Sequence, residues 1–134
     1  MATNLNTYLG IHPAALKLRS QRTEVIANNL ANADTPNFKA RDLDFRSALA
    51  AAGNKGASLT LATTRSAHIA LDASQPGGTT KHLYRIPLAP SLDGNTVDPQ
   101  LEQAAFAENA VRYQTSLSFL SGKFRSLMTA ITGQ

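Results

Sequence analysis

The residues that most often carry out catalysis or bind metal ions are few in this chain and widely spaced. His12, His68 and His82 match no metal-binding spacing, and there is no cysteine to complete such a site. Asp42 and Asp44 would share a face only on a strand, and no general acid or base partner is evident beside them. We therefore predict no catalytic residues, no metal site and no cofactor, and we expect the protein not to be an enzyme.

The basic residues outnumber the acidic ones but do not form a patch. The chain has 13 Lys and Arg against 9 Asp and Glu, for a net charge of +4. The basic residues are scattered from Lys17 to Arg125 with no run of three, which is typical of a solvated surface. The segment Gly53–Ser58 lacks the spacing of a phosphate-binding loop. We therefore expect neither nucleic acid nor a small-molecule substrate as a partner.

Length and composition indicate one domain. The 134 residues are 43% hydrophobic and include no cysteine, which excludes disulfide bonds. No stretch approaches the roughly 18 consecutive apolar residues of a membrane span. The N-terminal sequence MATNLNTYLGIHPAALK lacks the charged, apolar and small-residue order of a cleavable signal peptide. We expect neither a membrane span nor a standard secretory signal.

The clearest structural signal lies in the C-terminal third. Apolar residues alternate there in steps of four and three, the spacing of a heptad seam on a helix. Asp98 suits the N-cap of this helix, and Pro99 suits its first position, where the missing N–H is not needed. Such a seam must be buried against another helix. It comprises Phe106, Ala110, Tyr113, Leu117, Leu120, Phe124, Leu127 and Ile131.

The N-terminal third supplies a candidate partner helix from about Ala14 to Asn32. Pro13 kinks or starts this helix, so residues 2–12 form a separate, looser turn or two. The pairing is open between antiparallel and parallel, and an ordinary hairpin within one monomer is an alternative to pairing between subunits. The residues expected to face the C-terminal seam are Leu16, Leu18, Val25, Ile26 and Leu30.

The middle of the chain has a different character. Residues 44–52 predict a short helix, and strong Gly and Pro punctuation separates predicted strands at Ser58–Thr63, His68–Leu71 and Leu83–Leu88. The predicted fold class is mainly α. Long N- and C-terminal helices pair as a coiled coil, and the small central region is loop-rich and partly β. The three parts are residues 1–33, 34–97 and 98–134.

Three asparagines crowd the end of the N-terminal helix, although asparagine is a poor helix former. Their amides can satisfy the last free carbonyls of the helix, and Pro36-Asn37 suits the centre of a type II turn. One helix stop does not need three asparagines, so we also expect polar contacts with a neighbouring chain. The residues expected to shape the turn and to contact neighbouring subunits are Asn28, Asn29, Asn32, Asp34, Thr35, Pro36, Asn37 and Phe38.

The stretch from Ala27 to Phe38, ANNLANADTPNF, resembles the N-terminal signature shared by bacterial flagellar rod and hook proteins. The following KARDLDF and the SLDGNTVD before the C-terminal helix narrow the resemblance to the rod of the basal body. The resemblance covers residues 14–45 and 84–131. Asn37 stands where this family usually has glycine, and asparagine is the next-best residue for a positive φ.

The resemblance implies a structural, self-assembling subunit of the flagellar basal-body rod. Proteins of this family pair their terminal helices into the inner tube of the assembly, and these ends are typically disordered before assembly. The implied partners are other rod subunits, further copies of the chain, and the membrane-ring or export-gate end of the basal body. The implied location is the periplasmic part of the basal body, reached through the flagellar type III export channel. A different axial subunit and a soluble helical binding module that folds alone are the alternatives.

Overall fold

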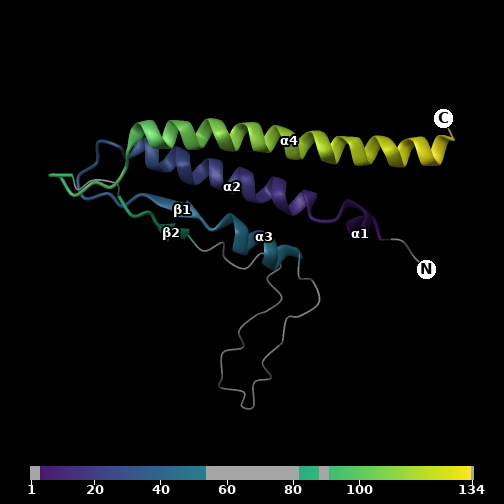
Figure 1. Ribbon diagram of the computed structural model, residues 1–134, viewed down its shortest axis with the longest axis horizontal. Helices are drawn as coiled ribbons and strands as arrows, with labels where there is room; N and C mark the ends of the chain where they lie inside the picture. The colour runs from purple at the N-terminus through teal and green to yellow at the C-terminus, as the bar shows by residue number, and fades with distance from the viewer. Residues whose placement is uncertain (1–3, 54–81, 88–90, 134) are drawn as a thin grey trace, which may run out of the picture.

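The computed structural model describes residues 4–53, 82–87 and 91–133, and it is mainly helical (Figure 1). This confirms the predicted class, with long N- and C-terminal helices and a small, loop-rich central region that carries two short strands. The elements in chain order are α1 (Leu5–Leu9), α2 (His12–Ala31), β1 (Arg41–Leu43), α3 (Phe45–Gly53), β2 (His82–Tyr84) and α4 (Pro99–Thr132).

The two long helices lie side by side along the long axis of the molecule and run antiparallel (Figure 1). Asn109 in the first half of α4 bonds the carbonyl of Arg19 in α2 at 2.9 Å. Further along α4, the Lys123 ammonium donates to the carbonyl of Tyr8 in α1 at 3.0 Å. The C-terminal part of α4 therefore lies next to the N-terminal part of the chain. Of the two pairings that the sequence left open, parallel and antiparallel, the structure has the antiparallel one.

Local chemistry sets where these helices begin and end. The Asp98 carboxylate accepts hydrogen bonds from the backbone N–H groups of Gln100 and Leu101 at the start of α4, where Pro99 occupies the first turn. At the other end, Gly133 adopts φ +73° and caps the helix. Gly10, at φ +61°, separates α1 from α2.

A two-stranded antiparallel sheet and α3 pack beneath α2. Arg41 pairs with Tyr84 and Leu43 with His82. The buried apolar side chains include Leu18 and Ile26 of α2 and Leu43 of β1. The guanidinium of Arg19 lies over the Phe45 ring, 4.3 Å from its centroid, and joins α2 to α3.

The predictions for the middle of the chain have mixed outcomes. The short helix expected at 44–52 is α3, shifted by one residue at each end. The strand expected at Leu83–Leu88 is displaced and shorter in the described part: β2 spans His82–Tyr84, and the Arg85 N–H after it still donates to Ala40 O at 2.9 Å. The strands predicted at Ser58–Thr63 and His68–Leu71 lie outside the described residues. Among the described helices, none has the length and apolar character needed to cross a bilayer.

Two turns at one end of the molecule, residues 32–40 and 91–98, are hydrogen-bonded together; we call them the turn pair. The predicted turn at Pro36-Asn37 is present: Phe38 N–H donates to Thr35 O at 3.3 Å, and Asn37 has φ +60°. Asn37 N–H then donates across to Asp93 O at 2.9 Å. The two turns therefore hold each other in one conformation.

A substitution at Gly94 tests how closely the two turns of the turn pair are packed. It has φ +73°, and a Cβ there would lie 2.6 Å from Asn37 Oδ1. We expect Gly94→Ala to lower the free energy of unfolding by about 1–3 kcal/mol, through backbone strain and this close contact. Gly122→Ala is the matched control: nothing lies within 4 Å of its Cβ on α4, so alanine should stabilise the helix by about 0.5–1 kcal/mol. Urea titrations followed by circular dichroism measure both, and equal effects would contradict the tight turn pair.

Candidate functional site

The heptad seam of α4 consists of two columns of apolar residues, and the structure treats them differently. We call the first the inner column; apart from Phe106, its members are half-buried against the N-terminal helices. The inner column is Phe106, Tyr113, Leu120 and Leu127. The second, which we call the outer column, is exposed along its whole length. The outer column is Ala110, Leu117, Phe124 and Ile131.

A column of polar residues on α4 faces α2, so the apolar seam of α4 does not point directly at α2. Glu102, Asn109, Ser116 and Lys123 follow one another at seven-residue intervals next to the inner column, and all are buried or half-buried. Because Glu102 and Asn109 are bonded to groups on the α2 side of the molecule, the helix places this polar column inward and the outer column outward. Of the eight seam residues, three are half-buried in the described part of the chain: Tyr113, Leu120 and Leu127.

Asn109 fixes the register between the two long helices. Its Nδ2 donates to Arg19 O and to Thr23 Oγ1, both at 2.9 Å, and Thr23 Oγ1 itself donates to Arg19 O at 3.0 Å. A buried amide bonded in this way tolerates no sliding of one helix along the other, because any shift would leave it unpaired. The interaction specifies one alignment of α2 and α4.

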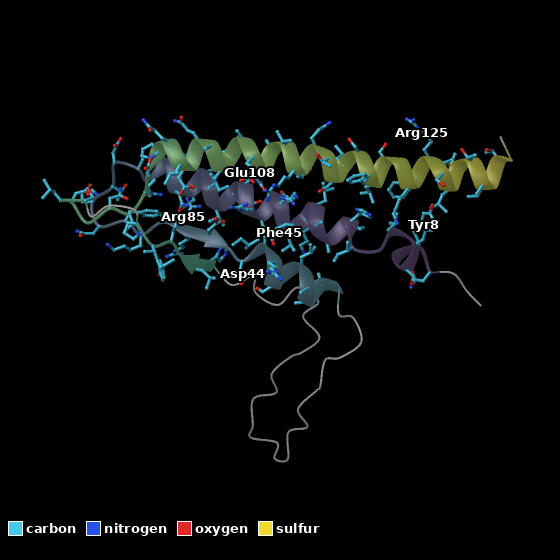
Figure 2. All side chains as sticks on the ribbon, in the orientation of Figure 1. Tyr8, Asp44, Phe45, Arg85, Glu108 and Arg125 are labelled. Atoms are coloured by element: carbon cyan, nitrogen blue, oxygen red, sulfur yellow. The ribbon has the colours of Figure 1, made fainter. Side chains whose placement is uncertain are left out.

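Arg85, which lies just after β2 and is labelled in Figure 2, joins three elements through an ion network. Its Nη1 donates to Glu102 Oε1 at 2.7 Å and its Nη2 donates to Asp42 Oδ2 at 2.8 Å. Arg22 of α2 binds the same Asp42 through two hydrogen bonds of 2.9 and 2.8 Å. Glu102 has no exposed surface, so Arg85 supplies the charge that compensates this buried carboxylate.

The ion network lowers the pKa of Asp42. Burial by itself would raise the pKa of this carboxyl group, but hydrogen bonds from Arg22, from the Leu43 N–H and from Arg85 outweigh it and hold the pKa below its ordinary value. The same contact with Asp42 raises the pKa of Arg22. Asp42, considered in the sequence only as a possible acid or base, is held here as a structural carboxylate.

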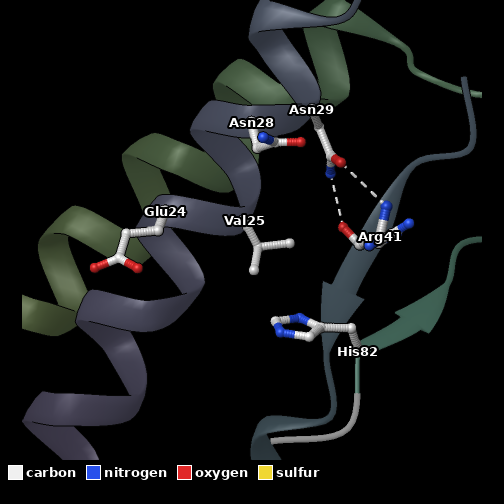
Figure 3. A pocket seen from close by; sticks show the side chains of 6 residues that line it. All are labelled: Glu24, Val25, Asn28, Asn29, Arg41 and His82. Atoms are coloured by element: carbon white, nitrogen blue, oxygen red, sulfur yellow. Dashed lines mark hydrogen bonds between the residues drawn. The ribbon is translucent and has the colours of Figure 1, made fainter.

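The asparagine-rich end of α2 is bonded mostly within the chain. Asn29 is buried and clamps the backbone of β1: its Nδ2 donates to Arg41 O at 2.7 Å and its Oδ1 accepts from Arg41 N at 3.1 Å (Figure 3). Asn32 Nδ2 caps the carbonyl of Asn28 at 2.8 Å, as expected for a helix stop. Asn28 itself is exposed.

A fourth asparagine, distant in sequence, completes this helix end. Asn95 is buried, and its Nδ2 lies 3.0, 2.6 and 3.0 Å from the carbonyl oxygens of Asn32, Ala33 and Thr35. The turn before α4 therefore caps the end of α2. Of the other motif residues, Phe38 is half-buried, and Asp34, Thr35, Pro36 and Asn37 are exposed.

The residues expected to face the seam from α2 share one property: none is exposed. Leu18 and Ile26 are buried, and Leu16, Val25 and Leu30 are half-buried. The helix α2 packs against both α4 and β1. The prediction that the apolar residues of α2 face only the C-terminal helix therefore describes only part of what α2 contacts.

The pocket in Figure 3 has a volume of about 230 Å³ and is open to solvent. It is lined by Glu24, Val25, Asn28, Asn29, Arg41 and His82. The hydrogen bonds drawn between these residues are the structural clamp of Asn29 on Arg41. In the described parts of the chain, no cluster of His, Cys, Asp or Glu has the geometry to hold a metal ion. The arrangement suits packing and hydrogen bonding.

Sequence reasoning missed the polar residues that organise the site. Arg85, Asn95 and Asn109 were not singled out, and Glu102 and Asp42 were not seen as partners of one arginine. A signal was present: Glu102 and Asn109 are seven residues apart and lie beside the apolar seam. Polar residues at that interval inside a heptad helix indicate a buried contact that specifies register.

Removing Arg85 should be costly because it leaves the Glu102 carboxylate buried without its counter-charge. We expect Arg85→Met to lower the free energy of unfolding by about 3–5 kcal/mol, and Glu102→Met in the same background to restore part of the loss. Arg112→Met is the control, since its surface pair with Glu108 should be worth at most about 0.5 kcal/mol. Urea unfolding at neutral pH measures the three variants and the parent chain. A double variant less stable than Arg85→Met would contradict this role of Glu102.

The depressed pKa of Asp42 predicts a stability that falls in acid. The unfolded chain has an aspartate pKa of about 3.9, above the folded value, so it binds more protons as the pH drops. The contribution of Asp42 is therefore complete above about pH 5 and is lost as the pH falls through the folded pKa. Between neutral pH and about pH 3, Asp42→Asn should lose less stability than the parent chain. Parallel curves for the two proteins would show that Asp42 is not the titrating group.

Comparisons with known proteins show the family of the chain. Residues 9–39 match the family model described as flagella basal body rod protein. The chain is 48% identical over 132 residues to the flagellar basal body rod protein FlgB of Cereibacter sphaeroides, covering 98% of this chain and 99% of the relative. It is 47% identical over 135 residues to FlgB of Aeromonas hydrophila, covering 100% and 99%.

FlgB of Escherichia coli (strain K12) is 45% identical over 135 residues, covering 98% of this chain and 97% of that protein. These relatives match from end to end, so the likeness includes both long helices and the middle. The chain belongs to the FlgB family of flagellar basal body rod proteins, and it is a structural subunit of the flagellar basal-body rod.

Proposed function

We propose that this rod subunit assembles by packing the outer column of α4 against the terminal helices of neighbouring subunits. The observation that carries the proposal is the exposure of this column. Phe124 is 44% exposed and Ile131 is 79% exposed, on a helix whose apolar spacing is that of a coiled-coil seam. A row of large apolar side chains along a whole helix face marks an interaction site.

A groove beside the outer column supports this packing. It lies between α2 and α4, has a volume of about 440 Å³, and is lined by residues of both helices. They are Ser20, Thr23, Glu24, Phe106, Ala110, Tyr113 and Gln114. Ala110 is a small residue in the lining of this groove, where a large side chain from a neighbouring helix would fit as a knob enters a hole.

The exposed residues of the turn pair are the second set of proposed contacts. Asp34, Thr35 and Pro36 are exposed on a turn whose backbone is held by bonds from Asn95 and from the Asp93 turn. Asn28 is exposed on the same end of α2. Asn29 and Asn32 are bonded within the chain, so they support this surface rather than form it.

The proposed role is mechanical rather than enzymatic, and membership of the rod family supports the partners proposed here. We propose further copies of this chain, other rod subunits, and the membrane-ring or export-gate end of the basal body as its neighbours. The proposed location is the periplasmic part of the basal body, reached unfolded through the flagellar type III channel. The absence of cysteine supports this route, because an unfolded passenger then carries no thiol into an oxidising compartment.

Leu117→Asp tests the outer column. This residue is 40% exposed at the middle of α4, so a charge there should leave the folded chain intact but oppose apolar packing between subunits. We expect the concentration for half-association to rise by at least about tenfold, a loss of roughly 1.4 kcal/mol or more, and motility to be lost in a strain that depends on this copy. Sedimentation velocity and swimming assays measure the two effects.

Ser118→Asp is the matched control, because it adds the same charge to the neighbouring exposed position outside the seam. It should associate like the parent chain. Leu120→Asp alters the half-buried inner column and should abolish assembly and motility while also weakening the α2–α4 pair. If Leu117→Asp assembles normally, the outer column is not the surface through which subunits pack. If the parent chain stays a monomer with a sharp thermal transition at every concentration, the proposed self-assembly is wrong and the chain behaves as a prefolded binding module.

A further inference from the structure

The edge of β1 that faces away from β2 is closed by a side chain. Antiparallel strands bond through alternate residues, and the Arg85 N–H donates to Ala40 O at 2.9 Å. The backbone groups of the next residue, Arg41, therefore point away from β2. Asn29 bonds both of them, the N–H at 3.1 Å and the carbonyl at 2.7 Å (Figure 3). Its amide takes the place that a neighbouring strand would have.

The far edge of β2 has no such cover among the described residues. Arg41 is paired with Tyr84, so the same alternation points the N–H and the carbonyl of Tyr84 away from β1. The strand β2 lies on the side of β1 that faces away from α2 (Figure 1). Within the part of the chain that the structure describes, no hydrogen bond reaches these two groups of Tyr84. This side of β2 is an open edge.

Large apolar side chains line this open edge. Leu83 and Tyr84 of β2 are 48% and 67% exposed, and Ile86 just beyond the strand is 89% exposed. Successive side chains of a strand point to opposite faces, so both faces of the edge are apolar here. An exposed apolar edge is a template for a further strand, and a sheet of two strands is marginally stable without one.

The chain itself supplies a segment that can reach this edge. Residues 54–81 link α3 to β2 and lie outside the described residues, and their last part runs directly into β2. The sequence predicts a strand at His68–Leu71, and the following residues 72–81 include Pro76-Gly77-Gly78, a composition typical of turns. Strands that are consecutive in sequence and joined by a short connection commonly pair with each other.

We propose that residues 68–71 dock on the open edge of β2 as a third, antiparallel strand, with Leu71 opposite Tyr84 and Ile69 opposite Ile86. In this register the two apolar residues of the segment share the face of Tyr84 and Ile86, so apolar side chains cover one another across the strands. The backbone of Leu71 then meets the free N–H and carbonyl of Tyr84. This docking surface is separate from α4 and its outer column.

Amide hydrogen exchange followed by NMR on the full chain, at low concentration, tests the docking. In the parent chain the Tyr84 N–H should be protected, and its backbone protons should show nuclear Overhauser effects to those of Leu71. Leu71→Pro removes the N–H that would bond Tyr84 O, and it should speed exchange of the Tyr84 N–H by at least about tenfold. The Arg85 N–H, which bonds Ala40 O, should stay protected and so report that β1 and β2 remain paired.

Leu61→Pro is the matched control, because it makes the same change in the other predicted strand, Ser58–Thr63, and it should leave exchange at Tyr84 unchanged. Exchange of the Tyr84 N–H in the parent chain at the rate of an unstructured peptide would overturn the proposal. So would protection that is lost only in Leu61→Pro, which assigns the edge to the other segment, or protection that appears only as the concentration rises, which assigns it to a second copy. If Leu71→Pro also exposes the Arg85 N–H, the Overhauser effects in the parent chain decide, and their absence overturns the proposal.

Discussion

The structure depends on the Arg85 guanidinium, which neutralises a carboxylate that has no exposed surface. Glu102 lies at the start of α4 and Asp42 in the middle of β1, and Arg85 binds both. Without this cation, a charge would be buried between elements that have few apolar contacts to spare. The small sheet therefore serves as the clamp that holds α4 on α2. This explains why a segment of only a few described residues matters to a molecule that is otherwise two long helices.

The polar contacts determine how the helices are aligned, and this decides which apolar residues remain free. Asn109 holds the register of α4 on α2, while the ion network holds the rotation of α4 about its own axis. Together they turn half of an apolar seam outward. A helix pair with a fully apolar interface would bury the whole seam and leave nothing for neighbours. The polar contacts that specify one alignment within the chain are thus what leave this apolar surface exposed.

Different interactions hold the two ends of the molecule. The turn pair is held by hydrogen bonds from side chains to backbone carbonyls, and Asn95 alone reaches three of them. The far end of α4 is held mainly by the contact of Lys123 with Tyr8 and by half-buried Leu120 and Leu127. A well-fixed end and a more exposed end suit a subunit whose neighbours complete its packing.

The sequence by itself determined the elements whose signals are local. Asp98 and Pro99 begin α4, the four-and-three spacing makes it a helix, and Pro36-Asn37 forms the turn with a positive φ, because each depends only on neighbours along the chain. The family was also evident, since its motifs are contiguous. The direction of pairing, the burial of Glu102 and Asn109, and the bonding of Asn95 to the end of α2 were decided only by the tertiary structure. The contacts of Asn95 and Asn109 join residues from 60 to 90 positions apart, and Arg85 meets Glu102 from 17 positions away. No local pattern shows which arginine will meet which carboxylate. The exposure of the outer column was also decided only by the tertiary structure. A heptad pattern shows which residues need a partner, but it does not show which of them the chain itself will cover.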